Sequence, residues 1–181
     1  MKALLDACVL YPTVMREMLV GVAGQGLYVP LWSDRILEEW ARAGAKTSAE
    51  FEVQARGEIA TLRANWPKSE IRIPDGAERK LWLPDPADIH VLAAAIRGHA
   101  DVIVTMNARD FPRNILAEEG LSRADPDNFL LGFYHAHPDA VGNVAARVLD
   151  TARRLSGEDW TIRKLMKKAR LPRLGKALEA G

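Results

Sequence analysis

Residues 85–107 read DPADIHVLAAAIRGHADVIVTMN, and this stretch predicts a helix that leads into a buried strand. Asp85 followed by Pro86 is typical of a helix start, and apolar residues recur from there to about Arg97. Residues 101–105 then form a short apolar run, which indicates a strand covered on both faces. Helices that alternate with buried strands favour a parallel α/β sheet.

The rest of the chain divides into an alternating region and a helical region. Before residue 112, we expect strands at 3–5, 28–29 and 70–73, and helices at 12–26, 33–44 and 47–66. After Pro112 the pattern predicts helices alone, near 129–134, 141–155 and 159–169. Because 181 residues would be cramped as two full domains, we expect one α/β core with a C-terminal helical extension.

Composition excludes several classes of protein. No apolar run approaches the roughly 20 residues of a membrane-spanning helix, and Asp6 comes too early for a signal peptide, so a cytoplasmic protein is expected. The single cysteine, Cys8, excludes an intramolecular disulfide and is interpreted as a buried structural thiol. The sequence contains no glycine-rich phosphate loop, dinucleotide fingerprint or hydrolase elbow.

Charge is unevenly distributed along the chain. The 25 basic and 24 acidic side chains give a net charge of +1. From Asn143 to Gly181, however, ten basic residues stand against four acids, so this part carries +6 and residues 1–142 carry −5. The C-terminal part is therefore a candidate surface for a polyanion, although lysines that only solvate the outer face of helices would have the same pattern.

Asp88 falls on the apolar face of its helix, in line with Leu92 and Ala95. A carboxylate there must be paired, hydrogen-bonded or bound to a cation, because burying it bare is costly. The alternative is that Asp88 is the third-position partner of an Asp85 N-cap, stabilised by the helix dipole. The pattern leaves both interpretations open, and Asp85 itself is expected to be only the cap.

Other polar side chains follow the buried strands. Asp6 comes directly after the first strand, and Asn107 and Asp110 follow residues 101–105. In open parallel sheets these ends meet at one edge, where ligands bind. Asp110 fits equally well as a turn residue before Phe111. Periodicity does not separate Glu38 from Glu39, since both flank the apolar side of their helix.

Several acids without a histidine or cysteine cluster favour a hard cation, Mg²⁺ or Mn²⁺, over zinc. The four histidines lack zinc-ligand spacing and are interpreted as structural or surface residues. They are His90, His99, His135 and His137.

Four blocks of this sequence, taken in order, resemble the PIN-domain family of metal-dependent ribonucleases, in particular the VapC-like toxins. The blocks are LDACVLYP around Asp6, SDRILEEW around Glu39, DPADIHVLAAA around Asp88, and ADVIVTMNARDFP from Thr105 to Asp110. The resemblance implies a three-layer fold, with a central parallel sheet flanked by helices, in a nuclease domain of residues 1–122. Residues 123–181 would form a helical C-terminal extension.

The resemblance also implies an acidic site that holds Mg²⁺ or Mn²⁺. It selects Glu39 over Glu38, so Asp6, Glu39 and Asp88 would be metal ligands, and with Asp110 the catalytic acids. Asn107 stands where many members have aspartate, so either Asn107 or Asp110 faces the metal, with Thr105 assisting. A third kind of function, phosphotransfer at Asp6, is disfavoured because Cys8 stands where a second acid is required.

The partners implied by the resemblance are an RNA substrate, a cognate antitoxin and a second copy of the chain, with no membrane. We expect a metal-dependent endoribonuclease that acts as the toxin of a toxin–antitoxin pair. The alternative is a non-catalytic PIN-like module that binds RNA or protein. The basic residues expected to hold RNA are Arg163, Lys164, Lys167 and Lys168.

Overall fold

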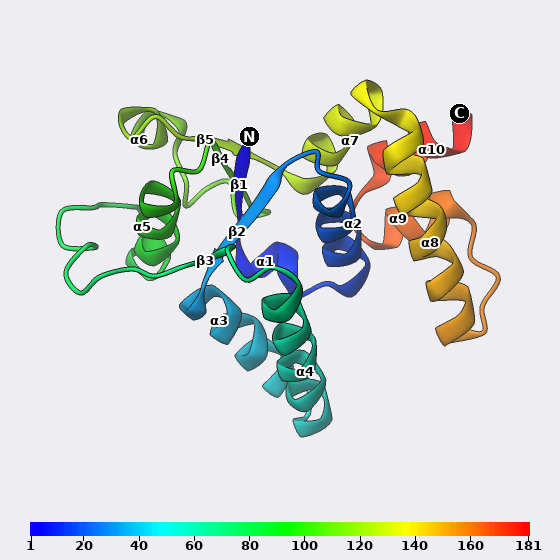
Figure 1. Cartoon of the computed structure of the whole chain (residues 1–181), viewed down its shortest axis with the longest axis horizontal. Helices are drawn as coiled ribbons and strands as arrows, with labels where there is room; N and C mark the ends of the chain where they lie inside the picture. The colour runs from blue at the N-terminus through cyan, green and yellow to red at the C-terminus, as the bar shows by residue number, and fades with distance from the viewer. The chain divides into compact units, whose positions relative to one another are not determined.

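The computed structural model describes all 181 residues and contains one five-stranded sheet (Figure 1). The strands are β1 (Lys2–Leu5), β2 (Val29–Ser33), β3 (Glu70–Ile71), β4 (Val102–Val104) and β5 (Ser122–Ala124). Their order across the sheet is β3-β2-β1-β4-β5, and every neighbouring pair is parallel. The prediction of a parallel α/β fold flanked by helices is confirmed.

Helices make up most of the remaining chain. They are α1 (Ala7–Leu10), α2 (Thr13–Gly24), α3 (Asp34–Ala45), α4 (Ala49–Asn65), the 3-10 helix η1 (Pro86–Asp88), α5 (Ile89–Gly98), α6 (Arg113–Glu118), α7 (Pro126–Ala136), α8 (Pro138–Ser156), α9 (Ile162–Lys168) and α10 (Pro172–Ala180). None of them is both long enough and apolar enough to cross a membrane.

The strand order reverses beside β1. From β1 the sheet grows through β2 and β3 on one side and through β4 and β5 on the other. Leu5 of β1 lies in register with Val104 of β4, so Asp6 and Thr105 leave the sheet next to each other. Such a switch point, at the carboxyl ends of parallel strands, is where open α/β sheets bind ligands.

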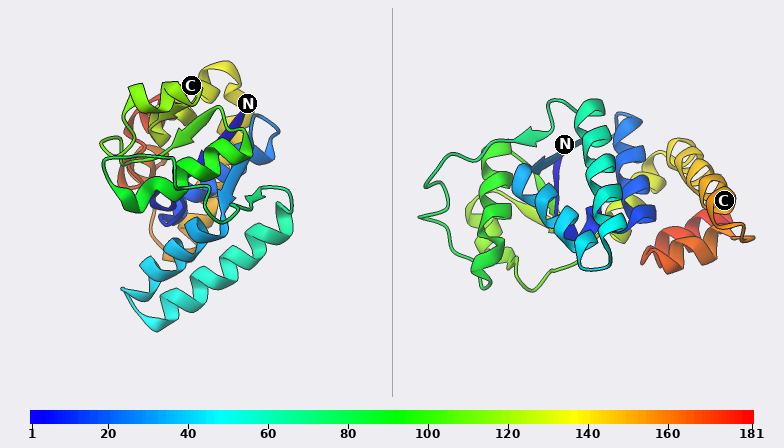
Figure 2. Two further views of the ribbon diagram at one scale, coloured as in Figure 1. Left: turned by 90° about the vertical axis from the view of Figure 1, so that its left-hand side faces the viewer. Right: turned by 90° about the horizontal axis from the view of Figure 1, so that it is seen from below.

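Helix α5 packs closely on the sheet and contacts β1, β2 and β3. Its residues His90 to Ala95 are all buried, and a Cβ atom at Gly98 would lie 2.9 Å from the Leu31 side chain. This close approach requires a residue without a side chain at position 98. Helix α3 packs on β2 and forms a hairpin with α4, and the two helices run side by side in Figure 2.

The chain folds into two compact units, and each consists of two sequence segments. The first unit contains residues 1–11 and 29–124, and the second contains residues 12–28 and 125–181. In the second unit the rings of Tyr28, Phe129 and Phe133 contact one another at centroid distances of 5.0–5.5 Å. The domains expected at 1–122 and 123–181 stay a prediction, but the structure groups residues 12–28 with the C-terminal helices.

One expectation for the C-terminal half is wrong. Residues 122–124 form strand β5, where helices alone were expected after Pro112. The segment Ser-Arg-Ala carries no apolar alternation, and it is a strand because the neighbouring β4 supplies its hydrogen bonds, including one from the Thr105 amide to the Ala124 carbonyl. Local pattern does not report a strand that depends on its partner in this way.

The buried carboxylate of Asp127 caps α10 and provides a test of the second unit. Its two oxygens accept hydrogen bonds from the amides of Arg173 and Leu174, both at 2.9 Å. We expect Asp127→Ala to lower the free energy of unfolding by about 2–3 kcal/mol, because both amides lose their partner.

Urea unfolding measures this change. The matched control is Asp150→Ala, an exposed acid of α8, which should change the free energy by less than about 0.5 kcal/mol. An equally small effect of both substitutions would contradict the capping role of Asp127.

Candidate active site

Asp6 occupies the N-cap position of α1, directly after β1, and its side chain is buried. One carboxylate oxygen, Oδ2, accepts hydrogen bonds from the Thr105 hydroxyl at 2.7 Å and from the Cys8 thiol at 3.1 Å. The Thr105 hydroxyl in turn accepts a hydrogen bond from the Asn107 amide at 3.0 Å. Asp6 is therefore held through one oxygen, and Oδ1 has no hydrogen-bond partner.

Cys8 takes part in this arrangement as a protonated thiol. Burial, with the charge of Asp6 as a smaller contribution, raises the pKa of the thiol to about 12. Its sulfur also accepts a hydrogen bond from the Met106 amide at 3.3 Å. Cys8 thus helps to fix the end of β1 and is not a thiolate nucleophile at neutral pH.

Asp88 lies at the end of η1 and forms the N-cap of α5. Its side chain is half-buried, and burial raises the pKa of the carboxyl from 3.8 to about 6, with further contributions from the charges of Asp6, Asp85 and Asp110. Asp85 caps η1 through a hydrogen bond from the Ala87 amide, at 2.9 Å, as expected. The sequence left two interpretations of Asp88 open, a residue of the helix start and a carboxylate of a site. The structure is compatible with both, because Asp88 occupies a helix start and its pKa is also raised by several acids.

Three carboxylates meet at this point of the sheet. Ligand atoms of Asp85, Asp88 and Asp110 all lie within 4.8 Å of one another. The Asn107 side-chain amide donates hydrogen bonds to Asp110 and, at 3.4 Å, to Asp88. The structure therefore brings Asp6, Thr105, Asn107, Asp88 and Asp110 together and adds Asp85, which the sequence had marked only as a cap.

Glu39 stands apart from these three acids, on α3. Its carboxylate oxygen Oε1 lies 2.8 Å from Nε2 of His90 and 3.7 Å from Nε of Arg35, whereas Glu39 is not among the groups that shift the pKa of Asp88. Its side chain is 39% exposed, so the carboxylate is accessible from solvent.

Glu38, the other candidate of this helix, is engaged elsewhere. It pairs with Arg56 of α4 at 3.0 Å and with Arg42 at 3.1 Å, and these hydrogen bonds lower the pKa of its carboxyl. The side chain therefore joins α3 to α4 in the helical hairpin. Glu38 thus takes part in ion pairs within the hairpin, whereas Glu39 contacts His90 of α5.

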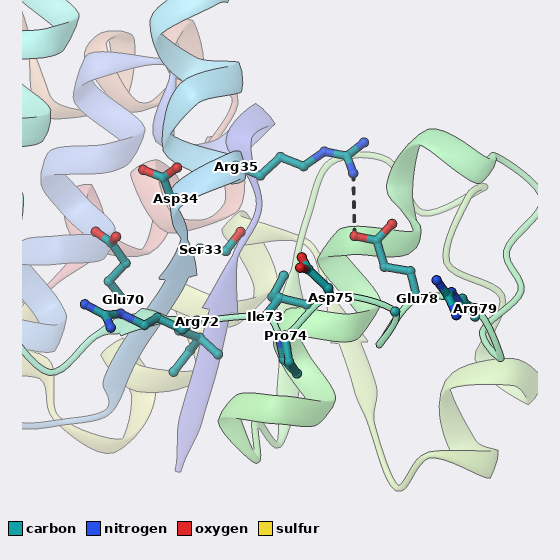
Figure 3. Close-up of a pocket in the computed structure, with 12 residues that line it drawn as sticks. Ser33, Asp34, Arg35, Glu70, Arg72, Ile73, Pro74, Asp75, Glu78 and Arg79 are labelled. Atoms are coloured by element: carbon teal, nitrogen blue, oxygen red, sulfur yellow. Dashed lines mark ion pairs between the residues drawn. The ribbon is translucent and has the colours of Figure 1, made fainter.

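A groove of about 620 Å³ opens beside β2 and β3 (Figure 3). Arg35 extends across it and lies 3.6 Å from Glu78, so the same guanidinium borders both the groove and Glu39. The groove carries charges of both signs, and Arg63 pairs with two of its acids, Asp34 and Glu70. No sequence pattern indicated this groove, since loop 72–79 has no periodicity.

The donor set fits a hard divalent cation. Burial raises the pKa of Asp88 to about 6, and the charges of Asp6, Asp85 and Asp110 add repulsion to this shift. A cation among these oxygens would remove that repulsion, and carboxylate oxygens are the ligands that Mg²⁺ and Mn²⁺ prefer. The basic residues expected to hold RNA lie in the second unit, on α9.

Comparison with known proteins identifies related sequences. A family model described as PIN domain matches residues 2–109. Over 63 residues, 35% of this chain, the sequence is 40% identical to "Putative ribonuclease VapC50" of Mycobacterium tuberculosis (strain ATCC 25618 / H37Rv). The aligned segment spans 37% of the length of that relative. No solved structure gives a significant match.

The raised pKa of Asp88 predicts how the metal-free protein responds to pH. Because the folded pKa, about 6, lies above the ordinary 3.8, this carboxyl stabilises the fold fully below pH 3.8, and the contribution is lost as the pH rises through 6. Carbon-13 NMR of the aspartate carboxyls should show Asp88 titrating near pH 6.

Asp110→Asn removes one of the repelling charges and should lower the pKa of Asp88. Asp75 is an exposed acid of the groove and does not contribute to the shift. Asp75→Asn is therefore the matched control and should leave the pKa of Asp88 unchanged. An Asp88 pKa that stays unchanged in Asp110→Asn would contradict repulsion between these two carboxylates.

Proposed function

Because the chain belongs to the PIN domain family, we propose that it is an endoribonuclease that requires Mg²⁺ or Mn²⁺ and hydrolyses RNA phosphodiester bonds. The observation that carries the proposal is the convergence of Asp6, Asp88 and Asp110 at the switch point of the sheet. We further propose that it acts as the toxin of a toxin–antitoxin pair, by analogy with its VapC relative.

The residues proposed to hold the cation are Asp6, Asp88 and Glu39, with Asp110 or Asn107 assisting. When bound, the ion would polarise the phosphate and lower the pKa of a water molecule. Asp6 is prepared for this role, because Thr105 and Cys8 occupy Oδ2 and leave Oδ1 available. Asn107 holds Asp88 and Asp110 together through its amide hydrogens.

Glu39 is proposed to complete the ligand shell or to orient the attacking water. Its side chain is accessible, and Oε1 already contacts His90 and Arg35, so Oε2 remains available. The acids therefore have complementary roles. Asp6 lies at the end of β1 and Asp88 at the start of α5, and Glu39 belongs to α3.

Loss of either central acid tests the catalytic proposal. We expect Asp6→Asn and Asp88→Asn each to lower the rate of Mg²⁺-dependent RNA cleavage by at least about 100-fold, because each substitution removes a charge that holds the cation. Cleavage of a labelled RNA measures the rate, and circular dichroism checks that the variants are folded.

Asp75→Asn, in the exposed loop of the groove, is the control for removal of an acid and should cleave at the wild-type rate. Wild-type cleavage by both Asp6→Asn and Asp88→Asn would show that this site is not the nuclease centre.

Asn107 supports a second candidate function, a PIN-like module that binds RNA or protein without cutting. Its amide donates to carboxylates of Asp88 and Asp110, and so it uses lone pairs that a cation needs. The two functions differ in one measurement. RNA that is bound but stays intact at millimolar Mg²⁺ would favour the non-catalytic module.

The basic surface of α9 is proposed to hold the RNA backbone. Two of its four candidate residues already have partners, since Arg163 pairs with Glu179 at 2.6 Å and Lys168 lies 4.8 Å from the Trp160 ring. Lys164 and Lys167 are exposed and have no such partner. These two lysines are therefore the ones best placed to contact phosphates.

Salt dependence of RNA binding tests this surface. Lys164→Ala and Lys167→Ala should each reduce the slope of log K against log salt by about 0.7, the value for one phosphate contact on a single strand. Lys46 is an exposed lysine at the end of α3 and serves as the control. Lys46→Ala should leave the slope unchanged. Equal slopes for all four proteins would remove α9 from the RNA-binding surface.

The remaining parts of the proposal concern location and partners. A nuclease toxin of this kind would act on RNA in the cytoplasm, be restrained by a cognate antitoxin, and associate as a homodimer. The alignment with the VapC relative covers only a third of either chain, so these partners rest on the family resemblance. Sedimentation of the purified protein measures its oligomeric state directly.

A further inference from the structure

His90 has the most enclosed ionisable side chain in the molecule. It lies in α5, two residues after Asp88, and it is the only acidic, basic or histidine side chain with no exposed surface. A residue whose only task is to fill the space under α5 would be apolar, as its neighbours Val91 and Leu92 are. An imidazole is costly there unless its nitrogens meet polar partners.

The carboxylate of Glu39 lies next to this ring. Nε2 of His90 lies 2.8 Å from Oε1 of Glu39, which is hydrogen-bond length. The contact is bent, since neither ring nitrogen has a well-directed hydrogen bond, and Nδ1 has no partner at all. The Glu39 side chain is 39% exposed, so it is not locked in place by surrounding atoms.

This contact links the two helices that carry the proposed acids. Glu39 belongs to α3, and Asp88 starts α5, so the distance between them depends on how these helices are held together. Arg35 approaches the same oxygen, Oε1, from the side of the groove at 3.7 Å. Two nitrogen-bearing groups therefore lie beside Oε1, and no contact is made by Oε2.

We propose that His90 is a positioning residue for Glu39. Its Nε2–H group donates to Oε1, fixes the orientation of the carboxylate, and leaves Oε2 as the oxygen that serves the site. The donation requires only a proton on Nε2, which both the neutral Nε2–H tautomer and the cation possess. The inference rests on the proposed function for what Glu39 does, but the contact itself is tested independently of activity.

The first experiment tests the contact by NMR on the metal-free full chain. Nitrogen-15 spectra of the histidine rings should show that Nε2 of His90 carries a proton, and Glu39→Ala should shift the signals of this ring. The signals of His135, on α7, should not move. A His90 protonated on Nδ1 alone, or unaffected by Glu39→Ala, overturns the proposal even if the protein cleaves RNA.

The second experiment measures function with two substitutions of His90. His90→Leu removes the donor and should weaken Mn²⁺ binding, measured by calorimetry, and lower kcat by about 10- to 100-fold, with KM for RNA unchanged. His90→Gln keeps an amide donor near the position of Nε2, and so it should stay within a few-fold of wild type. Equal losses in both variants would indicate a purely structural role and overturn the proposal.

A double-substitution cycle separates positioning from packing. If His90 acts through Glu39, His90→Leu causes no further loss of Mn²⁺ affinity when Glu39 is already alanine. Independent, additive losses would overturn the proposal. If His90→Leu fails to fold, the NMR experiment and His90→Gln still decide the outcome.

The design also distinguishes this proposal from the proposed function. Failure of the proposed function appears as wild-type cleavage by Asp6→Asn and Asp88→Asn, whereas failure of the His90 proposal appears in the ring signals. One of these results can occur without the other.

Discussion

The site depends on the parallel pairing of β1 with β4. This pairing puts Leu5 opposite Val104, and the next residue of each strand, Asp6 and Thr105, then leaves the sheet at the same edge. The hydrogen bond between them, 2.7 Å long, occupies one oxygen of Asp6 and leaves the other available. On Glu39 both nitrogen contacts fall on Oε1, from His90 Nε2 at 2.8 Å and from Arg35 Nε at 3.7 Å. In both acids the contacts thus fall on one oxygen, which is consistent with the proposal that the second oxygen serves the cation.

Features that depend on strand ends and helix starts could be predicted from the sequence. Buried apolar runs end at Asp6 and Thr105, and parallel strands bring such ends together, so the grouping of Asp6, Asn107 and Asp110 followed from topology. The parallel sheet itself was predictable for the same reason. The position of Asp88 was predictable only in part, because its pattern fitted a cap and a site equally well.

Features that depend on tertiary partners could not be predicted. Strand β5 has no apolar alternation and needs β4 beside it. Asp85 reads as a simple cap, and its proximity to Asp110 arises only when η1 meets the loop after β4. His90 was interpreted as a structural or surface residue, because helical periodicity does not indicate that Glu39 of another helix lies 2.8 Å from its ring. Side-chain contacts between distant elements are invisible to local pattern.

The division of each unit between two sequence segments has a consequence for synthesis of the chain. Helix α2 leaves the ribosome early, but its packing partners α7 and α8 are made only after the whole sheet. Until then Met15, Met18, Leu19 and Val22, buried in the finished protein, have nothing in their own unit to cover them. The second unit can therefore complete its packing only after the sheet has been synthesised, and an incompletely packed unit of this kind is prone to aggregate.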